Sequence, residues 1–243
     1  MIKTIIIDDE RLARKELDGL LQKYDTIQVV GEAANADEAE ERIAELSPDL
    51  LFLDINMPGR DGFELLGALE RVPLVIFVTA YDEHAVRAFQ VNALDYLVKP
   101  SDPVRLDLAV ARLPVPRESG VPERTVLGLE DQIFLKDGER CWFVALKDIR
   151  LFESEGNYVR VRFADQKPLV LRSLNKLEEK LDPHVFFRAN RKHIINLRWV
   201  DKIEPWFSGG LMVKLKHLDK SGEPETVEVS RRQAARFKDL LSL

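Results

Sequence analysis

The sequence of 243 residues has a single cysteine, Cys141, and no apolar run that approaches the roughly 20 residues of a membrane-spanning helix. A lone cysteine excludes a disulfide within the chain and fits a reducing cytoplasm, and its position before Trp142 favours core packing over a nucleophilic role. Before its first acids, the N-terminus has one lysine and only a short apolar stretch, unlike a secretory signal peptide. These absences predict a cytoplasmic protein that is neither secreted nor anchored in a membrane.

Basic residues are scarce in the first half of the chain and in excess in the second. Residues 1–120 contain 13 Lys and Arg against 23 Asp and Glu, a net charge of −10, whereas residues 121–243 contain 23 against 19, a net charge of +4. An acidic half joined to a basic half favours a nucleic-acid partner. Ordinary variation of surface charge is the alternative, because an excess of +4 is small.

The first half alternates short apolar segments, rich in β-branched residues, with segments of helical periodicity. Strands that are nearly continuous in apolar residues are typical of a parallel sheet covered on both faces. Five such strand–helix units in about 112 residues predict a small doubly wound α/β domain. The expected strands span residues 3–8, 27–33, 49–54, 73–80 and 93–99, and the last helix spans residues 102–113.

Residues 113–124 contain three prolines, one glycine and several charges without a hydrophobic period, which is typical of a linker. Beyond them, short alternating strands separated by turn signals predict a mostly β second domain. One helix is expected over residues 173–181, with Ser173 as its N-cap. The expected organisation is a first domain of residues 1–113, a linker of residues 114–129 and a second domain of residues 130–243.

Five polar residues lie at the ends of four expected strands in the first half. Because ligands of an open α/β sheet bind outside the carboxyl ends of its strands, we expect these residues to share one edge. Three carboxylates there are hard oxygen ligands suited to Mg²⁺, and a further hydroxyl and ammonium complete a site that could accept a phosphoryl group. Taken singly, each acid could be a helix cap, so their joint placement carries the argument. The residues are Asp8 and Asp9 after the first strand, Asp54 after the third, Thr79 after the fourth and Lys99 after the fifth.

Three segments resemble the receiver domain of two-component response regulators: IIIDDE at 5–10, LDINMPGRDGFELL at 53–66 and IFVTAYDEHAVRAFQVNALDYLVKP at 76–100. The resemblance covers residues 1–113 and implies a flavodoxin-like sheet of five parallel strands in the order 2-1-3-4-5. It implies that Asp54 accepts phosphate and that Lys99, joined to Pro100 by a cis bond, contacts the phosphoryl group. By the same resemblance, Mg²⁺ would be held by Asp9, Asp54 and the backbone carbonyl of Asn56, with Asp8 acting partly through water.

The resemblance also implies how the phosphoryl group is sensed and how long it lasts. Thr79 and Tyr96 would form a switch pair, in which the hydroxyl moves to the phosphoryl group and the ring turns inward. Tyr81, two residues after Thr79, would hinder attack by water and prolong the life of the phosphoaspartate. In the loop after Asp54, Gly59 and Gly62 are expected to serve backbone geometry.

Three segments of the second half, residues 144–163, 172–203 and 227–241, resemble the LytTR-type DNA-binding domain, a mostly β module that reads DNA through loops. Arginine and asparagine suit guanine, adenine and phosphate contacts, although a charged run can also be a solvated face. The stretch RANRKHI departs from the family pattern at Asn190 and Lys192, so the choice of base contacts stays open. The expected DNA-binding residues are Asn157, Arg188, Arg191, Lys192, Arg231 and Arg232, whereas Trp142, Trp199 and Trp206 are expected to serve core or hinge packing.

Together these features predict a transcriptional response regulator rather than an enzyme. A sensor histidine kinase would phosphorylate Asp54, the receiver would form a homodimer through residues 83–91, 94–98 and 102–112, and the paired β domains would bind double-stranded DNA. One alternative is a Mg²⁺-dependent phosphohydrolase, which normally needs a general acid where Asn56 offers none. A second alternative is a basic domain that binds protein or RNA.

Overall fold

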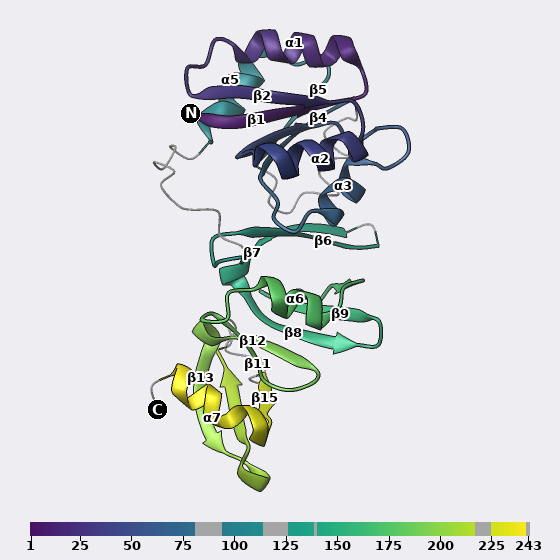
Figure 1. Ribbon diagram of the computed structural model, residues 1–243. Coiled ribbons are helices and arrows are strands. Elements are labelled where there is room, and N and C mark those ends of the chain that lie inside the picture. The colour runs from purple at the N-terminus through teal and green to yellow at the C-terminus, as the bar shows by residue number, and fades with distance from the viewer. Residues whose placement is uncertain (81–93, 114–125, 139, 217–224, 242–243) are drawn as a thin grey trace. The chain divides into compact units, whose positions relative to one another are not determined.

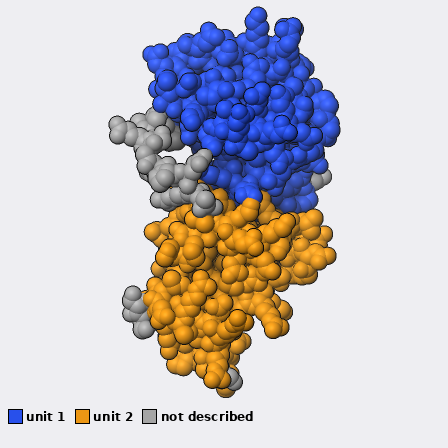
Figure 2. All heavy atoms as spheres, in the orientation of Figure 1, with its two compact units in different colours: residues 1–122, 132–143 blue, residues 123–131, 144–243 orange. Residues whose placement is uncertain are grey.

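The computed structural model describes residues 1–80, 94–113, 126–138, 140–216 and 225–241 (Figure 1). The expected helix over residues 83–91 and the role of Tyr81 lie outside the described residues. The chain divides into two compact units, unit 1 of residues 1–122 and 132–143 and unit 2 of residues 123–131 and 144–243 (Figure 2). In the described parts of both units, every helix is too short or too polar to cross a membrane.

Unit 1 is built on a parallel five-stranded sheet in the order β2-β1-β3-β4-β5, which confirms the predicted topology. The central strand β3 is buried along its whole length, because helices cover both faces of the sheet. The strands are β1 (Ile2–Ile7), β2 (Ile27–Ala33), β3 (Leu50–Leu53), β4 (Leu74–Thr79) and β5 (Asp95–Val98).

The alternation of side chains along the strands divides the core of unit 1 into two layers. One layer includes Leu53 and Phe77 and packs against helices α2 and α3, while the other includes Phe52 and Ile76 and packs against α1 and α5. The helices begin at polar caps where the sequence offers them, as at Asp61, whose side chain accepts a hydrogen bond from Glu64 N in a capping box. The helices are α1 (Arg11–Leu21), α2 (Ala36–Leu46), α3 (Gly62–Ala68) and α5 (Pro103–Ala111).

A β-hairpin of β6 (Gln132–Asp137) and β7 (Arg140–Ala145) adds an aromatic layer to unit 1. Its Phe134 stacks on Phe63 of α3 at 6.2 Å between ring centroids, and its Phe143 meets Phe77 of β4 edge-on at 6.2 Å. The hairpin thus packs with the core of unit 1 beside β4. The domain boundary predicted from the sequence instead assigns residues from 130 onward to the second domain.

Unit 2 is mostly β, as predicted, and contains a five-stranded sheet in the order β10-β9-β8-β12-β11 and a three-stranded sheet in the order β13-β14-β15. The expected helix appears as α6 (Leu174–Lys180), with Ser173 as its N-cap. The strands are β8 (Ile149–Glu155), β9 (Tyr158–Phe163), β10 (Leu169–Val170), β11 (Phe186–Arg188), β12 (His193–Asn196), β13 (Val200–Pro205), β14 (Leu211–Leu215) and β15 (Thr226–Val229), and the remaining helices are η1 (Leu146–Asp148), η2 (Leu197–Trp199), η3 (Phe207–Gly209) and α7 (Arg231–Leu240).

Candidate functional site

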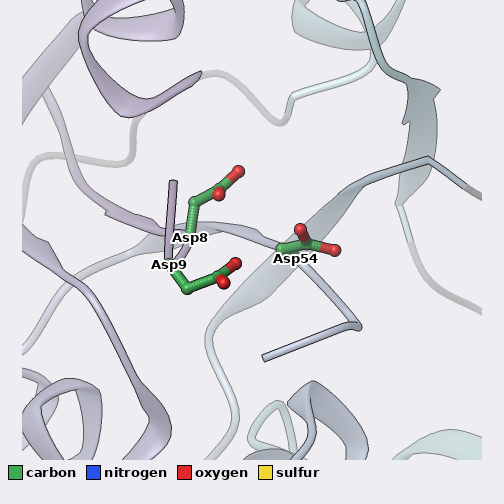
Figure 3. A group of neighbouring side chains, drawn as sticks. All are labelled: Asp8, Asp9 and Asp54. Atoms are coloured by element: carbon green, nitrogen blue, oxygen red, sulfur yellow. The ribbon is translucent and has the colours of Figure 1, made fainter. Parts of the chain in front are cut away.

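Three aspartates meet at the carboxyl edge of the sheet in unit 1 (Figure 3). Asp8 and Asp9 follow β1 and Asp54 follows the adjacent parallel strand β3, so the topology alone brings them to one edge. Each offers a carboxylate oxygen within 4.8 Å of the others. Asp8 and Asp54 are buried and Asp9 is exposed. Two neighbouring buried carboxylates repel one another, so this edge favours a cation.

Lys99 supplies a positive charge to this edge from the end of β5. Its Nζ lies 2.7 Å from Asp8 Oδ2 and 2.6 Å from Asp54 Oδ2. Burial by itself lowers the pKa of Lys99, but the hydrogen bonds to Asp54 and Asp8 outweigh it, and the pKa is raised above its ordinary value of 10.5. The bond between Lys99 and Pro100 is cis, as expected. Lys99 is therefore charged at neutral pH and joins the two buried carboxylates.

The backbone after β3 holds Asp54 in position. The N–H of Asp54 donates to Ile7 O at 2.8 Å, and the N–H of Asn56 donates to Asp54 Oδ1 at 3.0 Å. A Cβ on Gly62 would lie 2.6 Å from Asp54 O, so a larger residue would displace this loop. Gly59 has a φ of +82°, in the left-handed region. Both glycines therefore serve backbone geometry, in agreement with the sequence.

The candidate switch residues lie on one face of the sheet. Thr79 ends β4 and is fully buried, and Tyr96 of β5 pairs with Phe77, two residues before Thr79. Because side chains alternate along a strand, Thr79, Phe77 and Tyr96 point to the same side. The Tyr96 ring is half-buried, with the Arg105 guanidinium 5.4 Å from its centroid.

In unit 2, the loop between β11 and β12 is held by the side chain of Asn190. Its Oδ1 accepts from the N–H groups of Lys192 at 2.8 Å and His193 at 3.0 Å, and its Nδ2 donates to Glu228 O at 2.6 Å. The N–H of Ser230 also donates to Ala189 O at 3.0 Å. These bonds bring the loop of residues 189–192 beside the start of α7, although the two segments are about 40 residues apart in sequence.

A third segment reaches the same end of unit 2. Strands β8 and β9 are joined by the turn Gly156–Asn157, which is exposed, and Ser154 near that turn donates its N–H to Lys192 O at 2.7 Å. The structure thus gathers the predicted DNA-binding residues from three distant segments. We name this region the basic end and define it by Asn157, Arg191, Lys192, Arg231 and Arg232.

Arg188 differs from the other predicted DNA-binding residues because its guanidinium is engaged within the protein. Its Nε donates to Asn190 O at 2.7 Å and its Nη2 donates to Arg191 O at 2.9 Å, while Nη1 lies 3.4 Å from Glu178. Its side chain is only 13% exposed. These contacts make Arg188 a residue that positions the loop, a role that nothing in its sequence neighbourhood indicates.

The four cations of the basic end point to an anionic ligand. Arg191, Lys192, Arg231 and Arg232 are exposed, and within the described part of the chain they form no ion pair, unlike Arg162, which pairs with Glu153 at 2.7 Å. Arg231 and Arg232 occupy the first turn of α7, where the helix dipole disfavours a cation. A phosphate group at this helix end would offset that cost, because it can pair with the two arginines and is favoured by the helix dipole.

His193, beside the basic end, serves the structure of unit 2. Burial lowers the pKa of its imidazole below the ordinary value of 6.5, and this is opposed by Glu153, whose Oε1 lies 3.7 Å from Nε2. The ring also contacts Asn190 through Nδ1. The half-buried imidazole thus contacts both Asn190 of the loop and Glu153 of β8.

Comparison with known proteins matches two family descriptions to the two parts of the chain. Residues 4–111 match the response regulator receiver domain, and residues 139–242 match the LytTr DNA-binding domain. The chain is 36% identical to the sensory transduction protein LytT of Enterococcus faecalis over 98% of both chains. It is 33% identical to the sensory transduction protein LytT of Bacillus subtilis over the full length of both.

Solved structures resemble each part separately. The response regulatory domain of protein mrkE from Klebsiella pneumoniae is 34% identical and aligns with 46% of this chain and 94% of that domain, at a TM-score of 0.42. A LytTr DNA-binding domain from Bacillus cereus is 22% identical and aligns with 46% of this chain and 97% of that domain, at a TM-score of 0.41.

Proposed function

Since the chain belongs to the response regulators that join a receiver domain to a LytTR DNA-binding domain, and is thus a phosphorylation-dependent transcriptional regulator, we propose that Asp54 receives its phosphoryl group from a sensor histidine kinase. The position of Lys99 carries this assignment. Its ammonium lies 2.6 Å from Asp54, so a cation already stands where negative charge accumulates during phosphoryl transfer.

The transfer uses groups of this chain in defined roles. A carboxylate oxygen of Asp54 attacks the phosphorus of the kinase phosphohistidine, and the O–P bond forms as the P–N bond breaks, leaving the electron pair on the imidazole nitrogen. The N–H of Asn56 orients Asp54 through Oδ1. Lys99 faces Oδ2 and offsets the charge of the phosphoryl oxygens.

The chemistry of the donor set at this edge fits Mg²⁺. Asp8, Asp9 and Asp54 are hard oxygen donors within 4.8 Å of one another, and a magnesium site is commonly made of carboxylates together with phosphate oxygens and water. We assign Mg²⁺ to these three residues and the backbone carbonyl of Asn56. When bound, the ion would neutralise charge on the phosphoryl group.

The phosphoryl group then acts as a signal through the switch residues. We assign the sensing role to Thr79 and Tyr96, because both lie on the same face of the sheet and Thr79 ends the strand beside Lys99. We propose that the phosphorylated receiver forms a homodimer through β5 and α5. The exposed side chains of Val104 and Leu108, one helical turn apart on α5, support this surface.

Unit 2 binds DNA, and we assign the contacts to the basic end. Arg191, Arg231 and Arg232 can pair with guanine or phosphate, Lys192 with phosphate, and Asn157 with a base edge. We assign Arg188 to positioning, since its donors serve the loop carbonyls. Dimerisation joins two such interfaces and raises their effective concentration on repeated DNA sites.

The test of Asp54 uses the full chain with Mg²⁺ and acetyl phosphate as the phosphoryl donor. Mass spectrometry should show one phosphoryl group on the wild type and none on Asp54→Asn. Asp25→Asn is the matched control, because Asp25 is exposed and precedes β2, at the opposite edge of the sheet. Modification of Asp54→Asn, or modification that survives a chelator, would refute the assignment. Steady turnover of a phosphomonoester would support a phosphohydrolase instead.

A further inference from the structure

Two large aromatic side chains stand exposed at the connection between β13 and β14. Trp206 is 41% exposed and Phe207 is 77% exposed, and their rings meet edge-on with centroids 4.8 Å apart. Trp142, by contrast, is buried, as the sequence predicts. The expectation of core packing is therefore wrong for Trp206, whose ring packs against Phe207. We name Trp206 and Phe207 the aromatic tip.

The backbone of the aromatic tip is held in a defined conformation. The N–H of Trp206 donates to Gly210 O at 2.9 Å, and the N–H of Gly210 donates to Phe207 O at 3.1 Å. Gly209 has a φ of +83°, which favours glycine. A Cβ on Gly210 would lie 3.0 Å from Val229 O, so the tip closes tightly against the end of β15. The two rings are thus presented by a rigid turn.

The aromatic tip adjoins the basic end. Strand β14, which follows the tip, pairs with β15 through Leu211 and Val229, and β15 leads directly into Arg231 and Arg232. The position of a Cβ on Gly209 is 3.7 Å from Cγ of Arg231. Exposed aromatic rings therefore stand beside exposed guanidinium groups.

This combination matches duplex DNA better than it matches a protein partner. Proteins that kink DNA insert apolar side chains between base pairs while cations hold the flanking phosphates. Every base has a face on which an aromatic ring can stack, and the charge of Arg231 and Arg232 complements the phosphates. An apolar protein surface would leave those guanidinium groups without counter-charges.

We propose that the aromatic tip is a wedge that enters duplex DNA between two base pairs, with Phe207 leading and Trp206 supporting it. This proposal rests on the proposed DNA interface at the basic end. Arg231 and Arg232 hold the phosphates beside the wedge, and the duplex bends where the bases are unstacked. Flexible pyrimidine–purine steps are the preferred sites, because they unstack at the lowest cost.

The experiment uses the full chain, treated with Mg²⁺ and beryllofluoride, and an operator selected from random duplexes. 2-Aminopurine is placed at successive operator positions, and its fluorescence should increase at one base step for each bound protomer, where the bases are unstacked. Energy transfer between dyes attached to the two ends of the operator should become more efficient, because a bend brings the ends closer together. Phe207→Ala should abolish both signals and weaken operator binding by about tenfold or more. Phe207→Leu keeps the apolar bulk and should retain most of each signal. Unfolding temperatures should not change, since the ring is exposed.

Three outcomes would overturn the wedge proposal, and they distinguish its failure from the failure of the proposed DNA interface. If Phe207→Ala and Trp206→Ala bind and bend the operator as the wild type does while Arg191→Ala and Lys192→Ala weaken binding, the interface stands and the wedge fails. If all four variants bind as the wild type does, both fail. If Phe207→Ala abolishes self-association in sedimentation while the 2-aminopurine signal of the bound operator persists, the tip is a protein contact.

Discussion

At the scale of the residue, Lys99 determines the electrostatics of the phosphoacceptor edge. Asp8 and Asp54 are both buried, and the ammonium of Lys99 offsets the repulsion between their carboxylates. Lys99 contacts both carboxylates, so the positive charge that a phosphoryl group needs is already in place at this edge. The same arrangement makes the free energy of unfolding depend on this one side chain.

Replacing Lys99 with Ala should lower the free energy of unfolding by about 2–4 kcal/mol at pH 7 without Mg²⁺, because two buried carboxylates lose their partner. The pKa of Lys99 is raised in the folded protein, so its contribution is present at neutral pH and is lost as the pH rises above 10.5 through the folded value. Urea denaturation of wild type and variant at several pH values measures the difference. An equal difference far above the folded pKa would contradict this account.

The loop that carries Arg191 and Lys192 shows how a half-buried arginine, Arg188, differs from an exposed one. Arg188→Ala should weaken DNA binding by loosening the loop, yet leave the salt dependence of the affinity unchanged, because its guanidinium serves loop carbonyls. Lys192→Ala should weaken binding to all sequences and lower the salt slope by about one unit. Titration of operator and scrambled duplex at several salt concentrations separates the two. A lower slope for Arg188→Ala would make Arg188 a direct phosphate contact.

At the scale of the element, the β6–β7 hairpin extends the core of unit 1. Phe134, Cys141 and Phe143 are buried in the same core layer as Phe63 and Phe77. Phe134 also meets Phe143 across the hairpin at 5.1 Å between ring centroids. A two-stranded hairpin is marginally stable by itself, so these contacts with α3 and β4 stabilise it.

The single cysteine reports whether the hairpin is docked. Burial raises the pKa of Cys141 to about 11, and the residue is only 3% exposed, so a thiol reagent at pH 8 should label it slowly. Phe134→Ala removes a buried ring, should destabilise the docked hairpin by about 3–5 kcal/mol, and should accelerate labelling. Phe207→Ala is the control, because it removes an exposed ring in unit 2 and should leave the rate unchanged. Equal labelling rates for wild type and Phe134→Ala would exclude this packing as the protection of Cys141.

At the scale of the whole molecule, the proposed signal passes from one unit to the other through assembly of two protomers. The receiver surface of β5 and α5 carries exposed apolar side chains, and the basic end of unit 2 carries the cations. Two weak DNA interfaces gain affinity when they are linked, without any new contact. Phosphorylation can therefore control DNA binding through the oligomeric state.

Replacing both Val104 and Leu108 with Asp should prevent dimerisation by beryllofluoride, because the apolar surface would then carry two like charges. Phosphorylation of Asp54 should persist, and operator affinity should fall by about tenfold or more through lost avidity. Sedimentation and DNA titration measure the two effects. Leu12→Asp is the control, since Leu12 is 71% exposed on α1. A variant that still dimerises would place the interface elsewhere.

Much of this protein follows from its sequence because the deciding features are local or set by strand ends. The order of apolar strands and helices predicted the parallel sheet, and parallel strands bring Asp8, Asp9 and Asp54 to one edge whatever the details of packing. The N-cap Ser173 and the loop glycines were likewise predicted from the residues themselves.

Other features depended on long-range contacts that the sequence does not encode locally. The apolar face of the β6–β7 hairpin suits the core of either unit. It belongs to unit 1 because its rings pack against Phe63 and Phe77. Arg188 has the same side chain as the exposed arginines, but the carbonyls that it reaches and Glu178 are brought to it by the fold. Trp206 is apolar enough for a core, and the rigid turn at Gly209 and Gly210 exposes it beside Arg231. Strand ends and caps depend on neighbours in the chain, whereas the burial of a given side chain depends on which surfaces meet in the folded protein.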